Sequence, residues 1–152
     1  MTNSLIALHA LSTRYDAPLT AWGGSLLSAA IRVNVGWQFF KSGLTKIQDW
    51  DSTLFLFAEE YAVPLLSPSL AAVLGTLGEL LFPLLLFVGL FSRPAAMGLF
   101  LVNVVAVISY PALAEFTCPA AINDHINWGV LSLVIVAFGP GRLSLDTWLG
   151  RS

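Results

Sequence analysis

The chain has 152 residues, of which 57% are hydrophobic and 11% are charged, with a formal net charge of −2. A soluble domain carries about 25% charged residues, so this composition is typical of a membrane protein. No basic cluster of the kind that neutralises phosphates is present, which argues against nucleic acid as a partner. The single cysteine, Cys118, rules out an intrachain disulfide and a cysteine-based metal site within one chain.

The N-terminal stretch "MTNSLIALHALSTRYDAPLT" has neither a basic leader nor a small-residue cleavage pattern. Leu5, Leu8 and Leu11 recur at helical spacing instead of forming a continuous apolar block. This spacing predicts a retained helix at the membrane interface rather than a signal peptide.

Four apolar stretches follow, and each approaches the roughly 20 helical residues that cross a hydrocarbon core. They are too long for barrel strands and lack the alternation of such strands. The sequence therefore predicts an all-α integral membrane four-helix bundle with short interfacial helices, built as a single domain over 1–152. The expected transmembrane helices are 21–43, 69–90, 94–112 and 126–142.

The connections between these helices differ in length. The second and third are separated by only a few residues around "SRP", which predicts a tight antiparallel hairpin, and "GPG" closes the fourth. Between the first and second, "QDWDSTLFLFAEEYAVP" predicts a short helix on the membrane surface. Asp51 or Ser52 is its expected N-cap, and Pro64 its stop.

The distribution of basic residues predicts the orientation. With the N-terminus in the cytoplasm, four arginines fall on the cytoplasmic side and two lysines on the other, as the positive-inside rule requires. Both termini are therefore expected to be cytoplasmic. The residues counted are Arg14, Arg93, Arg142 and Arg151 against Lys41 and Lys46.

Two charges fall inside the apolar stretches. Arg32 lies about 11 residues, or roughly 16 Å, from the start of the first helix, and Glu79 lies at a similar depth in the second. A charge at the bilayer centre costs on the order of 2.5 to 3.5 kcal/mol and seeks a partner. Small residues share a helical stripe with each of them, so we expect a direct Arg32–Glu79 pair, with Asn103 of the third helix in reach. Such a pair could lock the assembly or line a polar cavity, a proton path or a quinone site.

A second polar set gathers toward the outer face. His125, with a reference pKa of about 6.5, could transfer protons, cap a helix or lie at the interface. Cys118 would face the oxidising side, where it is either a reactive thiol or a spectator. A lone histidine argues against a metal site. The set comprises Gln38, Lys41, Lys46, Tyr110, Cys118, His125 and Asn127.

The strings "IRVNVGWQFFKSGLTKIQDWD", "GELLFPLLLFVGLFSRPAAMGLF" and "GPGRLSLD" resemble the DoxX family of four-helix membrane proteins over most of residues 25–146. "TKIQDWDSTLFLFAEEYAVPLL" and "VNVVAVISYP" are most similar to the branch encoded beside genes for copper- or gold-responsive, cysteine-modified peptides and their iron-dependent modifying enzymes. The resemblance implies redox or thiol-stress work at the bacterial inner membrane. Carried over by position, the resemblance implies that the residues of interest are Arg32, Lys41, Lys46, Glu79, Arg142 and Asp146.

The leading functional hypothesis is an accessory or quinone-interacting subunit of a redox or thiol/metal-stress system. The chain lacks a nucleotide fingerprint, paired histidines and paired cysteines, so it is expected to be a non-catalytic subunit served by a soluble redox or peptide-modifying enzyme. A transporter or exporter subunit for a metal or modified peptide is an alternative, and that would need a homo-oligomer to form a pore. A structural anchor for a soluble enzyme is another.

Overall fold

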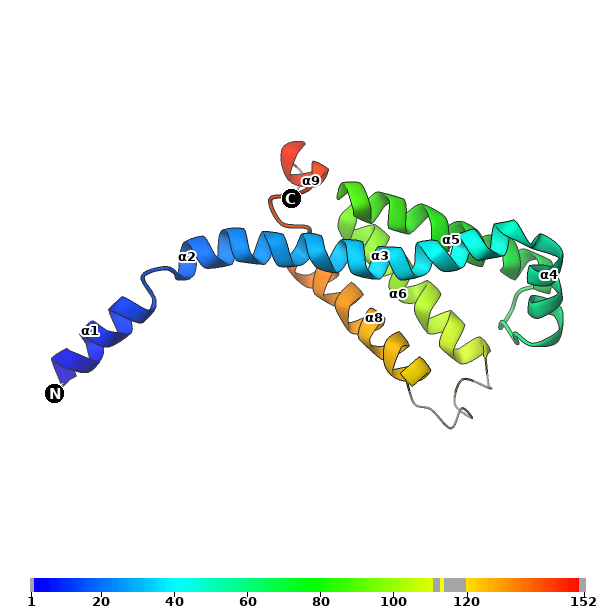
Figure 1. Ribbon diagram of the computed structural model, residues 1–152, viewed down its shortest axis with the longest axis horizontal. Helices are drawn as coiled ribbons and strands as arrows, with labels where there is room; N and C mark the ends of the chain where they lie inside the picture. Colours follow the sequence, from blue (N-terminus) through cyan, green and yellow to red (C-terminus); the bar gives the residue numbers. More distant parts are fainter. Residues whose placement is uncertain (1, 111–112, 114–119, 151–152) are drawn as a thin grey trace.

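The computed structural model describes residues 2–110, 113 and 120–150, which form helices and connecting loops with no strand among them (Figure 1). This confirms the predicted all-α fold. The bundle is built from four long helices: α3 (Gly24–Gln48), α5 (Pro68–Val88), α6 (Ser92–Ser109) and α8 (Ala120–Phe138). Shorter elements are α1 (Thr2–Ser12), α2 (Asp16–Pro18), the π-helical turn η1 (Leu19–Gly23), α4 (Trp50–Glu59) and α9 (Leu145–Trp148).

Among the described residues, helices α5, α6 and α8 are long and apolar enough to cross a membrane, and the molecule is a membrane protein. Their outward faces carry large exposed apolar side chains, such as Leu77 and Leu81 on α5, which suit contact with lipid. Helix α3 has 25 residues and is about 38 Å long, which is sufficient length. It is less apolar because Arg32, Asn34 and Gln38 interrupt it, and its crossing of the bilayer stays a prediction.

Helix α3 packs along α5 in the antiparallel sense, through glycines. A Cβ on Gly36 would lie 2.7 Å from the Phe87 ring, and one on Gly43 would lie 2.8 Å from the Leu80 side chain. The absence of side chains at these positions lets the two helices approach closely, which strengthens their dispersion contact in a membrane. The predicted small-residue stripe of α3 therefore faces α5.

The apolar core lies where all four long helices meet. Val35, Leu86, Leu99 and Ile135, one from each helix, are almost completely buried. At one edge of this core the rings of Phe39 on α3 and Trp128 on α8 make a T-shaped contact.

Helices α5 and α6 form the predicted tight hairpin, with only residues 89–91 between them. Gly89 ends α5 in the left-handed conformation, at φ 69°, where a glycine C-cap avoids the cost of a side chain. Further along, the Phe82 ring lies over Gly98 of α6, 2.5 Å from where a Cβ would stand. The two helices are in close contact here and separate toward their other ends (Figure 1).

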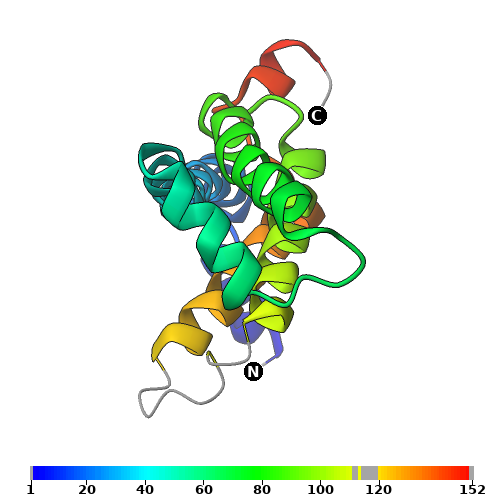
Figure 2. The same ribbon diagram turned by 90° about the vertical axis from the view of Figure 1, so that its right-hand side faces the viewer.

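Helix α4 follows α3 after a sharp turn and lies across one end of the bundle (Figure 2). Its N-cap is Asp49, whose carboxylate accepts hydrogen bonds from the Ser52 amide at 3.0 Å and the Ser52 hydroxyl at 2.6 Å. The predicted caps, Asp51 and Ser52, were therefore wrong, because the helix begins earlier than its apolar residues suggest. Phe57 attaches α4 to α5 by packing on Ala71 and Ala72.

After α8 the chain turns back onto α3 through residues 139–146, which we call the C-terminal clasp. The Ser28 hydroxyl donates to the Gly139 carbonyl at 2.9 Å, and the Ser25 hydroxyl accepts from the Arg142 amide at 2.9 Å. Gly141 has φ 73°, and a Cβ there would lie 2.7 Å from the Ser25 backbone. The "GPG" motif thus both ends α8, as predicted, and allows a close backbone contact.

Replacing Gly141 by Ala should destabilise the protein more than replacing Gly150 by Ala. Both glycines have a left-handed backbone, but only Gly141 faces another segment, since nothing lies within 4 Å of a Cβ on Gly150. The expected extra loss is about 1–3 kcal/mol, the usual cost of overpacking. Thermal unfolding in detergent, followed by circular dichroism, measures it. Equal losses in the two variants would contradict the close approach.

Candidate functional site

Arg32 lies at the end of the bundle where α5 turns into α6. Its side chain is buried, with only 2% of the residue exposed. Nη1 donates to the Leu86 carbonyl at 3.0 Å, and Nη2 donates to the Leu143 carbonyl in the clasp. The last carbonyls of a helix lack partners within it and carry partial negative charge, so a guanidinium at the end of α5 is well placed.

Asp146 completes this arrangement from the clasp. Its two carboxylate oxygens accept hydrogen bonds from the amides of Phe91 and Ser92, both at 2.8 Å, at the N-terminus of α6. Burial of the carboxyl opposes ionisation, but the hydrogen bonds from Ser92 and Phe91 and the nearby positive charge of Arg32 outweigh it and hold the pKa of Asp146 below its usual range. The clasp therefore joins α3, α5 and α6 at one end.

The predicted Arg32–Glu79 pair is wrong. Glu79 lies against Gly43 of α3, and eleven residues of helix, about 16 Å, separate Gly43 from Arg32. At the level of Arg32, helix α5 has already reached its last turn. The equal-depth estimate failed because it took the start of the apolar stretch as the membrane boundary, whereas α3 extends beyond the end of α5.

Glu79 pairs with Lys46 instead. The Lys46 Nζ is 2.6 Å from Glu79 Oε2 and also donates to the Ser42 hydroxyl at 2.8 Å. The two side chains are 18% and 11% exposed, so the pair is largely removed from solvent. An ammonium has three donors, and these contacts use two of them. The Thr53 hydroxyl donates to the Lys46 carbonyl at 3.0 Å and so fixes the end of α3 beside the pair.

This ion pair lines a cavity of about 440 Å³, which we call the α5/α6 cavity. The cavity lies where α5 and α6 separate, and its walls also include residues of α3, α4 and α8. Phe57 and Phe82 form part of the apolar wall. Leu74, Leu101 and Val105 also line it and are substantially exposed, so the cavity opens toward the lipid-facing surface between α5 and α6.

His125 contributes a second polar group to the α5/α6 cavity. Its Nδ1 lies 2.8 Å from Asn103 Oδ1, and Asn103 Nδ2 donates to the His125 carbonyl at 2.8 Å. Asn103 was predicted to lie within reach of Arg32 on α3. It is hydrogen-bonded to His125 on α8 instead. Gly129 leaves room for its carboxamide, since a Cβ there would lie 3.2 Å from Nδ2.

Aromatic side chains and a loop enclose the cavity near α4. Tyr61 makes T-shaped contacts with Phe57 and Tyr110, and the Ala62 amide donates to the Ser109 carbonyl at 2.8 Å. Burial, assisted by Tyr110, Glu60 and Glu79, raises the pKa of the Tyr61 phenol. Ser109 lines the cavity, and its hydroxyl is buried with no hydrogen-bond partner among the described residues.

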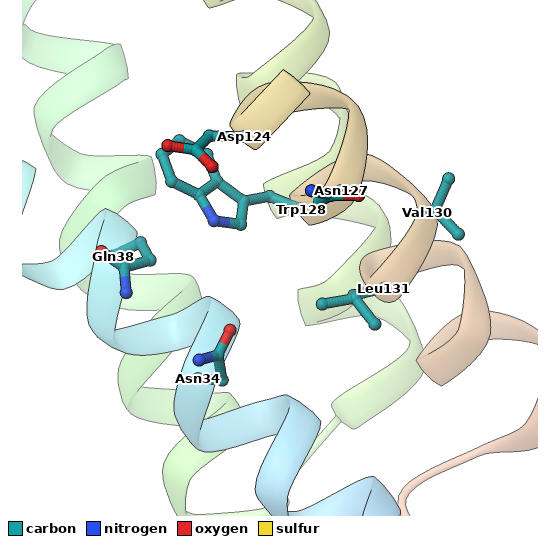
Figure 3. A pocket seen from close by; sticks show the side chains of 7 residues that line it. All are labelled: Asn34, Gln38, Asp124, Asn127, Trp128, Val130 and Leu131. Carbon is teal, nitrogen blue, oxygen red and sulfur yellow. The ribbon is translucent and has the colours of Figure 1, made fainter. Parts of the chain in front are cut away.

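A separate depression lies between α3 and α8, with a volume of about 500 Å³, and we call it the α3/α8 groove. Figure 3 shows Asn34 and Gln38 on α3 and Asp124, Asn127 and Trp128 across from them on α8. The three carboxamides make no hydrogen bond to any residue that the structure describes. This groove is more open and more polar than the α5/α6 cavity.

The predicted outer-face set divides between these two features. Gln38 and Asn127 line the groove, Lys41 is exposed outside both, and Cys118 lies outside the described residues. The members that share the cavity are Lys46, Tyr110 and His125.

Sequence reasoning missed Tyr61. The loop after α4 turns this side chain inward onto Phe57 and Tyr110. Its spacing of four residues from Phe57 is the sequence signal that could have predicted their contact, although α4 ends at Glu59. Within the described ranges, no three His, Cys, Asp or Glu side chains are placed to hold a metal ion.

The packing of four long helices, with one charge cluster at the α5–α6 turn and another midway along α5, defines a small α-helical membrane protein. A family profile for DoxX matches residues 27–122, more than half of the chain. The chain therefore belongs to the DoxX family.

A relative from Haemophilus influenzae is 28% identical over 141 residues, which cover 90% of this chain and 91% of the relative. That relative is described only as an uncharacterized protein. No solved structure matches this chain significantly.

Asp146→Asn should destabilise the protein at pH 7 by about 1–3 kcal/mol, because an amide group cannot accept from both Phe91 and Ser92 as well as a carboxylate does. The folded pKa lies below the unfolded value of about 3.9, so the stabilisation is present above that pH and is lost as pH falls through the folded pKa. The gap between wild type and variant should shrink below about pH 4.

Thermal unfolding in detergent across this pH range measures the gap, and Glu59→Gln, at an exposed site, is the matched control. A gap that is constant with pH, or no gap at pH 7, would show that the carboxylate does not hold the clasp.

Proposed function

We propose that this chain is a quinone-interacting accessory subunit of a redox system in the bacterial inner membrane, and that the α5/α6 cavity is its quinone site. The observation that carries the proposal is the Lys46–Glu79 ion pair at the wall of an otherwise apolar cavity that opens toward lipid. Ionisable residues in this setting mark ligand or proton sites more often than simple packing.

The residues present fit a quinone head group. A quinone ring offers carbonyl acceptors, and Lys46 retains one unused donor at the cavity wall. The rings of Phe57 and Tyr61 provide flat apolar surface for stacking.

The apolar tail of such a ligand has a route out of the cavity. Leu74, Leu101 and Val105 are exposed at 49%, 56% and 40%, and each also lines the cavity. A polyprenyl tail could remain in the lipid beside these side chains while the ring reaches the ion pair. Sites with apolar walls and a few placed polar groups are typical of small-molecule binding.

The ion pair also places a hydrogen-bond donor, Lys46 Nζ, at the wall of the cavity. Glu79 compensates the charge of Lys46 in an apolar site, so the ion pair does not leave an unpaired charge beside the ligand. A bound quinone would supply the electron chemistry, whereas the side chains of this chain bind and orient the ring, with Lys46 Nζ as the donor and Glu79 Oε2 as the acceptor that holds Lys46 in place.

We further propose that the electrons come from a partner protein, since the sequence has no nucleotide fingerprint and no paired cysteines. A soluble redox or peptide-modifying enzyme of a thiol- or metal-stress system fits this role. The distribution of arginines supports cytoplasmic termini, which puts the clasp on the cytoplasmic side and the α5/α6 cavity toward the outer side.

Lys46→Met should weaken the binding of decylubiquinone about 10-fold or more, since a hydrogen bond from a charged group contributes about 1.5–3 kcal/mol. Lys41→Met is the matched control, because Lys41 lies on the same helix, is exposed and lines neither the cavity nor the groove. Calorimetric titration of the purified protein in nanodiscs, corrected with empty nanodiscs, measures both affinities.

The Lys46→Met/Glu79→Leu double variant keeps the test valid if the single variant unfolds, because it removes both charges and leaves none uncompensated. A folded double variant that binds decylubiquinone as tightly as wild type would refute the proposed site. So would the absence of binding by the wild type.

A further inference from the structure

The hydrogen bonds between Asn103 and His125 determine where the imidazole carries its proton. The His125 backbone carbonyl can only accept, so the Asn103 atom 2.8 Å from it is the donor Nδ2. The other oxygen of the pair, Asn103 Oδ1, can only accept, and it lies 2.8 Å from His125 Nδ1. Nδ1 must therefore carry a hydrogen, and in the neutral ring Nε2 has an unprotonated lone pair.

The surroundings of His125 hold this ring in place. Asn103 is buried, with 4% of the residue exposed, and the imidazole makes a T-shaped contact with the Trp128 ring at a centroid distance of 5.0 Å. Gly129 lies directly against the Asn103 carboxamide. No described residue hydrogen-bonds Nε2, and the residue lines the α5/α6 cavity.

We propose that His125 Nε2 is a hydrogen-bond acceptor of the α5/α6 cavity and that the site consequently prefers ring ligands with a hydroxyl group, the hydroquinone class, over ring ligands with only ether oxygens. This inference rests on the proposed function and adds a specificity-determining residue to it. Lys46 Nζ can only donate, so it can bond to hydroxyl and ether oxygens alike and cannot make this distinction. The neutral His125 Nε2 on α8 can make this distinction, because it accepts a hydrogen bond from a hydroxyl group and an ether oxygen has no hydrogen to donate.

The tautomer can be observed without any ligand. The chain has two histidines, and replacing the exposed His9 by Gln leaves His125 as the single signal in protein labelled with ¹⁵N-histidine. At about pH 8, above the reference pKa of about 6.5, correlations to the ring protons should show hydrogen on Nδ1 and none on Nε2. Asn103→Leu should abolish this preference. Hydrogen on Nε2 in the otherwise wild-type protein would overturn the inference.

Ligand selectivity is tested with 2-decylhydroquinone and its 1,4-dimethyl ether, titrated under argon into the protein in nanodiscs. The hydroquinone should bind about fivefold more tightly than the ether, the range expected for one neutral hydrogen bond. His125→Phe keeps a ring against Trp128 but has no acceptor, and it should bind the hydroquinone and the ether about equally.

If His125→Phe fails to fold because Asn103 loses its partner, the Asn103→Leu/His125→Phe variant replaces it, since both polar groups are then absent. The outcomes separate the two proposals. Equal binding of hydroquinone and ether by the wild type would overturn the role of His125 and leave the cavity as a quinone site. Failure of all ring probes to bind would instead refute the proposed function.

Discussion

The ion pair between Lys46 and Glu79 is the interaction around which the part of the bundle that holds the α5/α6 cavity is organised. A charge in a membrane bundle must find a partner, and Lys46 and Glu79 meet at 2.6 Å because α3 and α5 approach closely along glycines. The packing of α3 on α5 therefore decides which charged groups line the cavity. Separating α3 from α5 would leave two uncompensated charges in an apolar setting.

Arg32 and Asp146 also have partners for their charges, at the turn between α5 and α6. Arg32 donates to one carbonyl at the end of α5 and to one in the clasp, and Asp146 caps α6, so the clasp holds the two helices together at their turn. Because the hairpin is held at that end, α5 and α6 can diverge at the other and leave space for a ligand. The clasp thus has a structural role, and the α5/α6 cavity is the site that we propose for ligand binding.

Much of the fold could be predicted. Long apolar stretches indicated the helices, the short connection around "SRP" indicated the α5–α6 hairpin, and the small residues of α3 indicated its contact face. The partner of Glu79 could not be predicted from depth alone. Arg32 and Lys46 lie on the same face of α3, and only the offset between α3 and α5 decides which of them reaches the carboxylate. Asn103 and His125 likewise meet through the packing of α6 on α8, which has no signal in the sequence of either helix.

The most direct test of the account is the place where a quinone contacts the protein. A photoactivatable short-chain quinone, crosslinked in native membranes and located by mass spectrometry, should label the cavity walls, for example Phe57 on α4 or Leu101 on α6, and unlabelled quinone should suppress this labelling. Labelling confined to the α3/α8 groove around Asn34 and Gln38, or labelling that unlabelled quinone does not suppress, would contradict the account.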